Sequence, residues 1–221
     1  PRIGKPVEVN ALWFNALKIL EYFSQRLDQD DSRYAELADR AKQGFQRFVK
    51  SEGGLYDVLE TPEGDDATIR PNQIFALSLP WPLVDNSQAE LILKTVQQQL
   101  YTSYGLRTLA PEDKKYCGRY QGGVTKRDSA YHQGTVWAWL LGHFAMADYR
   151  LYKDARRALS ILTPVQDHLN DAGLGSISEI FDAEAPHMPR GAPVQAWSVA
   201  TILQAWWFIK QSDIKPGTSE T

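Results

Sequence analysis

Residues 178–197 combine three carboxylates, a histidine, an arginine and an amide in a proline-rich stretch that suits neither a helix nor an ordinary strand. The side chains of interest among them are Glu179, Asp182, His187, Arg190 and Gln195. Glycoside hydrolysis needs two carboxyl groups that flank the scissile bond, because its transition state resembles an oxocarbenium ion. Arginine, amide and imidazole groups hold sugar hydroxyls. The stretch therefore favours a pocket that cleaves a sugar bond.

Similar polar groups recur along the chain. Asn10, Asn72, Gln133 and Gln195 each precede an aromatic-aliphatic run, and they follow one another at intervals of roughly 60 residues, the length of two helical hairpins. The plain alternative is an amide near the start of four core helices. Further polar residues accompany the amides, and this favours a shared pocket. They are Glu8, Arg70, Gln73, Tyr131, His132 and Arg190.

The sequence lacks the motifs that would indicate other kinds of active or binding site. The sequence has no glycine-rich phosphate loop, no CxxC or HExxH pattern and no G-x-S-x-G turn, and its four histidines lack metal-ligand spacing, so we expect no metal and no cofactor. The net charge of −3 without a basic run argues against nucleic acid and anionic membranes. Cys117 is the only cysteine, which favours a reducing, cytoplasmic compartment.

The elements that must position these residues are helical. Apolar spacing predicts helices over 7–28, 32–50, 71–80, 86–101, 131–149, 152–170 and 193–210. Residues 102–128 are predicted to form a long irregular loop, and weak strand signals lie near 106–109 and 177–181. Every second helix is apolar on most faces, as expected for the inner helices of an α/α toroid. The N-terminal ends of the inner helices would then bring the polar groups to one mouth of the ring.

Several side chains have more than one interpretation. Glu8 is a hydroxyl-binding or orienting carboxylate, or simply an acidic residue in the first turn of a helix. Arg107 and Asp128 suit the rim or lid of the pocket. Trp residues fill cores by default, but we expect Trp13 and Trp137 to face a sugar ring. Trp197 is a further candidate.

Four segments together resemble a known family. They are PRIGKPVEVNALWFNAL, RPNQIFALSLP, RDSAYHQGTVWAWLLG and GSISEIFDAEAPHMPRGAPVQAWSV. They resemble the C-terminal glucosidase domain of glycogen debranching enzymes, a six-hairpin glycosidase with trehalase and glucoamylase toroids as distant relatives. The resemblance implies an all-α (α/α)6 toroid that hydrolyses α-1,6-glucosidic stubs of an α-glucan with inversion. It assigns the general base to Glu179 of the EIFD motif and the general acid to a W-M-D segment upstream of PRIGKP.

These 221 residues contain no W-M-D segment. We therefore expect a fragment, with residues 1–211 forming an incomplete arc of about seven helices and residues 212–221 a disordered tail. The fragment alone should be inactive, and it should either self-associate through uncovered inner-helix flanks or curl so that it covers them itself. Two alternatives remain: another toroidal glycosidase, similar to trehalase or glucoamylase, and a non-catalytic carbohydrate-binding toroid. A terpenoid-cyclase-like toroid is disfavoured because no aspartate-rich metal motif is present.

Overall fold

The chain divides into two compact units, Pro1–Thr95 and Val96–Thr221, in the computed structural model, which describes residues 2–172 and 174–214. Helices dominate both units, and the two sheets are small. No helix within the described ranges is long and apolar enough to cross a bilayer. Nor does any cluster of three or more His, Cys, Asp and Glu residues there suit a metal ion.

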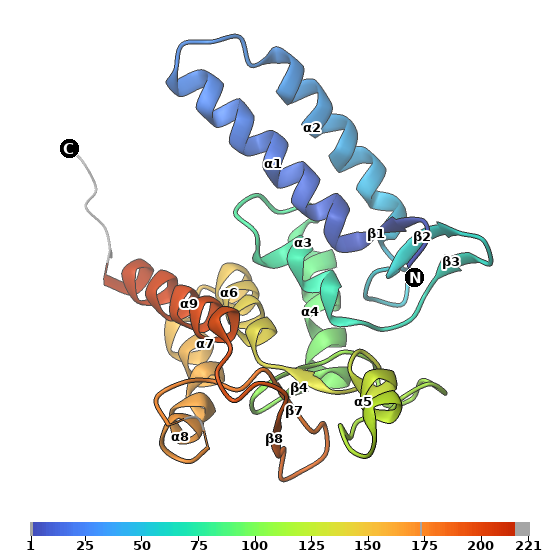
Figure 1. Cartoon of the computed structure of the whole chain (residues 1–221). Coiled ribbons are helices and arrows are strands. Elements are labelled where there is room, and N and C mark those ends of the chain that lie inside the picture. Colours follow the sequence, from blue (N-terminus) through green and yellow to red (C-terminus); the bar gives the residue numbers. More distant parts are fainter. Residues whose placement is uncertain (1, 173, 215–221) are drawn as a thin grey trace. The chain divides into compact units, whose positions relative to one another are not determined.

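The first unit is built on a helical hairpin (Figure 1). α1 (Val7–Arg26) buries Val7, Ala11, Phe14 and Leu17, which share one face at a spacing of three or four residues. α2 (Ser32–Phe45) packs on it and continues into the 3-10 turn η1 (Gln46–Phe48). Pro71 opens η2 (Pro71–Ile74), where its missing N–H costs nothing, and α3 (Phe75–Ser78) follows.

A three-stranded antiparallel sheet closes the base of this hairpin. Its strands are β1 (Lys5–Pro6), β2 (Val58–Thr61) and β3 (Gly64–Asp66), in that order. Pro6 pairs with Val58, and this pairing places the start of α1 beside the start of β2. α4 (Asn86–Gln99) begins in the first unit and ends in the second.

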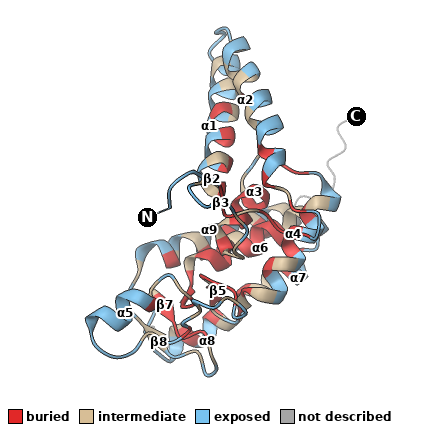
Figure 2. Cartoon of the chain, turned by 90° about the vertical axis from the view of Figure 1, so that its right-hand side faces the viewer, coloured by how far each residue is buried: buried red, intermediate tan, exposed pale blue. Residues whose placement is uncertain are grey.

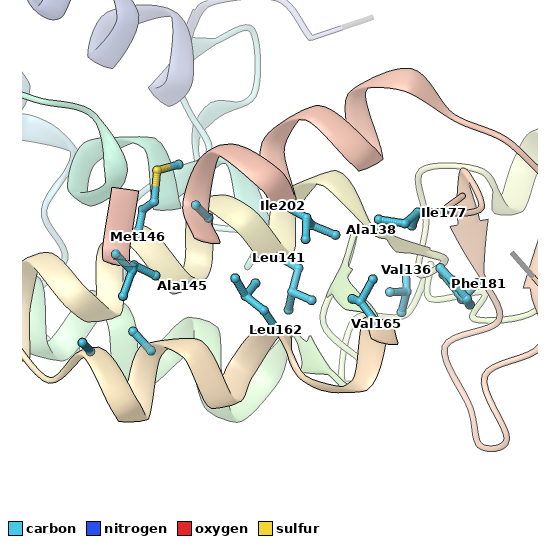
Figure 3. Close-up of a cluster of buried hydrophobic side chains, with 14 of the residues drawn as sticks. Val136, Ala138, Leu141, Ala145, Met146, Leu162, Val165, Ile177, Phe181 and Ile202 are labelled. Atoms are coloured by element: carbon cyan, nitrogen blue, oxygen red, sulfur yellow. The ribbon is translucent and has the colours of Figure 1, made fainter. Parts of the chain in front are cut away.

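The second unit packs α6 (Trp139–Tyr152) against both α7 (Ala155–Leu162) and α9 (Ala196–Ile214). Figure 3 shows their buried contact, which includes Leu141, Leu162 and Ile202. α6 and α9 approach closely at Gly142, where an added Cβ would lie 2.3 Å from the carbonyl oxygen of Thr201. α5 (Val124–Ala130) and α8 (Pro164–Asn170) are short helices of the same unit.

A ribbon of five very short antiparallel strands crosses the second unit. Its strands are β4 (Tyr101–Thr102), β5 (Gly105–Arg107), β6 (Val136–Trp137), β7 (Ile180–Phe181) and β8 (Pro189–Arg190), in that order. Segments that are distant in sequence thereby become neighbours. The ribbon sets the positions of the residues that follow or precede its strands.

The fold class is confirmed, with corrections to the elements. The predicted helix 131–149 is wrong at its start: Tyr131, His132 and Gln133 lie in the turn between α5 and β6, and α6 begins at Trp139. Gly134, with a φ of +145°, interrupts the helix there. The predicted helix 152–170 divides at Pro164. Only β5 and β7 coincide with predicted strand signals, and the strands β1, β2, β3, β4, β6 and β8 were not predicted.

The ends of the chain follow the prediction in part. α9 continues to Ile214, into the predicted tail, and residues 215–221 of that tail lie outside the described residues. Large apolar side chains are exposed on α1, among them Trp13 and Phe23, and on α9, among them Leu203 and Trp207. Figure 2 shows many exposed positions, coloured pale blue, along α1 and α2. Uncovered apolar flanks were expected of the inner helices in general, without reference to particular ones.

Candidate active site

Glu179 lies directly before β7, and its carboxylate is held by three donors. The Tyr131 hydroxyl donates to Oε1 at 2.5 Å, and the Gln195 amide donates to the same oxygen at 3.3 Å. The backbone N–H of Ala192 donates to Oε2 at 3.0 Å. The Glu179 N–H in turn donates to the Ala192 carbonyl at 2.9 Å. The carboxylate is therefore fixed in orientation, yet the residue remains only partly buried.

Gly191 makes room for this carboxylate. Its φ of +65° lies in the left-handed region, and a Cβ there would lie 2.3 Å from Oε2 of Glu179. Glycine is the residue that tolerates both conditions. The PRGAP sequence thus turns the chain tightly around Glu179 and presents the Ala192 N–H to it.

Tyr131 is supported by an aromatic cluster. Its ring meets Trp137 edge-on with centroids 4.9 Å apart, and the Trp137 indole N–H donates to the Tyr131 carbonyl at 3.0 Å. The His132 ring stacks on Trp137 at 5.3 Å. Burial, and then the bond to Glu179, raise the pKa of the Tyr131 hydroxyl, so it remains a protonated donor at neutral pH.

Asp182, expected to bind substrate, is instead buried in a network within the protein. Its Oδ2 accepts from Nε and a terminal nitrogen of Arg190 at 3.0 and 2.9 Å, and its Oδ1 accepts from the Tyr120 N–H at 2.8 Å. His187 lies beside it, with Nδ1 3.1 Å from the Asp182 carbonyl. Asp182 and Arg190 therefore hold the loop that follows β7, and a role for either residue in binding substrate stays a prediction.

The remaining candidates of the second unit differ in exposure. Arg107 lies on β5 and donates to the Ala183 carbonyl at 3.1 Å, so it supports the loop after β7. Asp128 is exposed on α5. Trp137 is only 6% exposed, which leaves little of its ring for the sugar contact that was expected. Trp197 is 52% exposed, at the start of α9.

His168 anchors the segment just before Glu179. Its Nε2 accepts the Ser178 N–H at 3.1 Å, and the ring is buried. Burial lowers the pKa of His168, which keeps the ring neutral and able to accept this bond. The histidine is structural.

The first unit holds a second polar group around Glu8. Asn10 donates to the Pro6 carbonyl at 2.8 Å in the first turn of α1, and Trp13 is 52% exposed one turn later. Asn72 lies partly buried in η2. Gln73 is buried, and its amide accepts from the Leu55 N–H and donates to the Arg70 carbonyl, so it organises backbone.

Two members of this group escaped the sequence analysis. Asp57, buried, binds Arg2 through both carboxylate oxygens and lies 3.9 Å from Nε of Arg70. Burial raises the pKa of Asp57 to about 6, against the opposing effect of Arg2 and Arg70. An aspartate between glycines and a strand forms no recognisable motif, so nothing in the sequence indicated that Asp57 joins this group. That Glu8 and Glu179 serve one pocket stays a prediction.

Comparisons with known proteins identify relatives among glycosidases. The family model described as amylo-alpha-1,6-glucosidase matches residues 1–204. The glycogen debranching enzyme of Saccharomyces cerevisiae is 24% identical over 204 residues, which cover 81% of this chain and 13% of that protein. This chain thus spans a small part of that relative.

Solved structures share the fold. The GH63 mannosylglycerate hydrolase of Thermus thermophilus matches with a TM-score of 0.68 and 18% identity, over 92% of this chain and 45% of that one. The neutral trehalase of Saccharomyces cerevisiae matches with a TM-score of 0.52 and 14% identity, over 92% and 38%. These neighbours are α/α toroids, which confirms the fold class. The chain belongs to the amylo-alpha-1,6-glucosidase family.

Proposed function

We propose that this chain is the C-terminal part of the glucosidase domain of a glycogen debranching enzyme and that Glu179 is its general base. The observation that carries the proposal is the Glu179 carboxylate, oriented by Tyr131, Gln195 and the Ala192 N–H while still partly exposed. A base in an inverting glycosidase must be ionised, fixed and accessible to one water. Family membership supplies the reaction class.

In this mechanism Glu179 takes a proton from water as that water attacks the anomeric carbon. The bond to the departing oxygen breaks on the opposite face of the sugar, and a carboxylic acid about 6.5–9.5 Å from the base protonates that oxygen. The acid comes from outside these 221 residues, in the W-M-D segment that the family resemblance implies. The protonated Tyr131 hydroxyl stabilises the Glu179 anion before the proton moves.

The substrate is an α-1,6-linked glucose stub on an α-glucan. Glu8, Arg70 and Asn72, with His132 and Gln195, are proposed to bind its hydroxyls; Trp13 and Trp197 offer exposed rings to a pyranose. The lone cysteine favours a cytoplasmic location for such an enzyme.

Glu179→Gln in the intact enzyme tests this proposal. We expect glucose release from limit dextrin to fall about 10²- to 10⁴-fold, the usual contribution of a general base, while a glucose-like iminosugar still binds. Glu184→Gln is the matched control, because Glu184 lies just beyond the other end of β7 and bonds Tyr116 and Arg119 instead. Near-normal turnover of Glu179→Gln would exclude it as the base. Hydrolysis of trehalose in preference to limit dextrin would favour the trehalase-like alternative.

The chain of 221 residues by itself should release no glucose, because a base without its acid leaves the departing oxygen unprotonated. Hydrolysis by the purified chain would mean that it contains the acid, with Glu8 or Asp128 as the candidates.

A further inference from the structure

The guanidinium of Arg2 lies between two carboxylates. Its two terminal nitrogens bind both oxygens of Glu8, one of them Oε2 at 3.0 Å. On the other side, Nε donates to Oδ2 of Asp57 at 3.1 Å, and a terminal nitrogen donates to Oδ1 at 2.9 Å and to the Asp57 carbonyl at 3.1 Å. Both pairs are bidentate, which fixes the plane of the guanidinium as well as its position.

The Asp57 end of this chain of ion pairs is firmly anchored. Asp57 donates its N–H to the Asp66 carbonyl at 2.8 Å and accepts the Val7 N–H at 3.0 Å, so the strand β3 and the start of α1 both hold it. Arg70 adds a second cation 3.9 Å away. The pKa of Asp57, raised by burial to about 6, still leaves it mainly ionised at pH 7, which maintains the ion pair.

The two carboxylates differ in what they can touch. The Asp57 side chain is 2% exposed, while that of Glu8 is 17% exposed. Each Glu8 oxygen accepts from Arg2 and keeps a lone pair for another donor. Asp57 therefore cannot meet a substrate, but Glu8 can accept a hydroxyl.

We propose that Arg2 and Asp57 are positioning residues that hold the Glu8 carboxylate in place to accept a hydroxyl of the bound glucose. This inference rests on the proposed function, because it gives Glu8 a sugar as its partner. The order of action is Asp57, then Arg2, then Glu8. Substitution of Arg2 should therefore weaken substrate binding only while residue 8 is a glutamate.

A double-mutant cycle in the intact enzyme tests this order. We expect Arg2→Gln and Glu8→Gln each to lower kcat/KM on an α-1,6-glucosyl oligosaccharide on the order of tenfold, and the double variant to be no worse than Glu8→Gln alone. Asp57→Asn keeps the shape of its side chain, and it should reproduce the Arg2→Gln effect if that variant folds poorly. Arg47→Gln is the matched control, since Arg47 forms an exposed pair with Glu60 in the same unit.

The same cycle in the Kd of a glucose-like iminosugar separates this inference from the proposed reaction. One outcome is that the intact enzyme fails to cleave α-1,6 bonds while the double variant binds the iminosugar no more weakly than Glu8→Gln alone. That outcome would uphold the positioning role and refute the proposed reaction. Independent, multiplying losses would overturn the positioning role, as would an Arg2→Gln enzyme that matches Arg47→Gln. A wild-type enzyme that binds no such ligand would overturn both.

Discussion

Gly191→Ala should displace the proposed base without removing any polar group. An alanine Cβ would lie 2.3 Å from Oε2 of Glu179, well inside van der Waals contact. The carboxylate must then move, and it loses the Ala192 N–H, a bond to a charged acceptor worth about 1.5–3 kcal/mol. Holding alanine at a φ of +65° costs roughly 1–2 kcal/mol more.

These two effects have different readouts. Strain and the lost bond together should destabilise the protein by roughly 2.5–5 kcal/mol, and each kcal/mol lowers Tm by about 2–4 °C in a protein of this size. A shift of about 1 Å in a catalytic group can cost on the order of hundredfold in rate. We therefore expect kcat on limit dextrin to fall about hundredfold in the intact enzyme, with KM much less affected.

Gly175→Ala separates the two effects. Gly175 also has a positive φ, +86°, but a Cβ there meets nothing within 4 Å. This control should show the backbone strain in its Tm and keep its kcat. Equal kcat values for Gly191→Ala and Gly175→Ala would refute the argument that the turn at Gly191 sets the position of Glu179.

Three further predictions concern packing, pH and association. Gly142→Ala should destabilise the protein by about 1–3 kcal/mol in urea unfolding, because its Cβ would meet the Thr201 carbonyl. If the variant unfolds at the same urea concentration as the wild type, α6 and α9 can move apart without cost. Asp57 has a folded pKa above its unfolded value, so its contribution is present below about pH 4 and lost as pH rises through about 6. The unfolding free energy of wild type relative to Asp57→Asn should thus fall by about 2 kcal/mol between pH 4 and 7, and a constant difference would contradict the shift. The chain alone should self-associate through the exposed faces of α1 and α9, and Trp207→Lys should weaken this association. A molar mass of 25.0 kDa by light scattering, the mass of one chain, would contradict the prediction.

The sequence predicted the long elements and part of the site. α1, α2, α4 and α9 were predictable because each keeps an apolar pattern over several turns. The grouping of Tyr131, Glu179 and Gln195 followed from motifs that stand next to such helices. Their mutual hydrogen bonds match the expectation that these segments meet.

What escaped prediction depends on contacts between distant residues. Strands of two or three residues are too short to show a period of two, so the ribbon β4–β8 left almost no pattern in the sequence. The pairing of Arg2 with Asp57 spans 55 residues and depends on the pairing of β1 with β2. Asp182 was predicted to bind substrate because of its residue type and its position in the EIFD motif. The same residue type can instead hold a loop, and the burial of Asp182 in the structure favours that second role.

The five-stranded ribbon also distinguishes segments that position Glu179 from loops whose length does not affect the strand pairing. Residues 108–135, between β5 and β6, and residues 182–188, between β7 and β8, leave and rejoin the ribbon at paired positions. Insertions within these two loops that leave Tyr131 in place would alter the surroundings of Glu179 while the strand register that carries it is kept. A lineage could therefore acquire new glycoside substrates by loop insertion, with the base inherited unchanged.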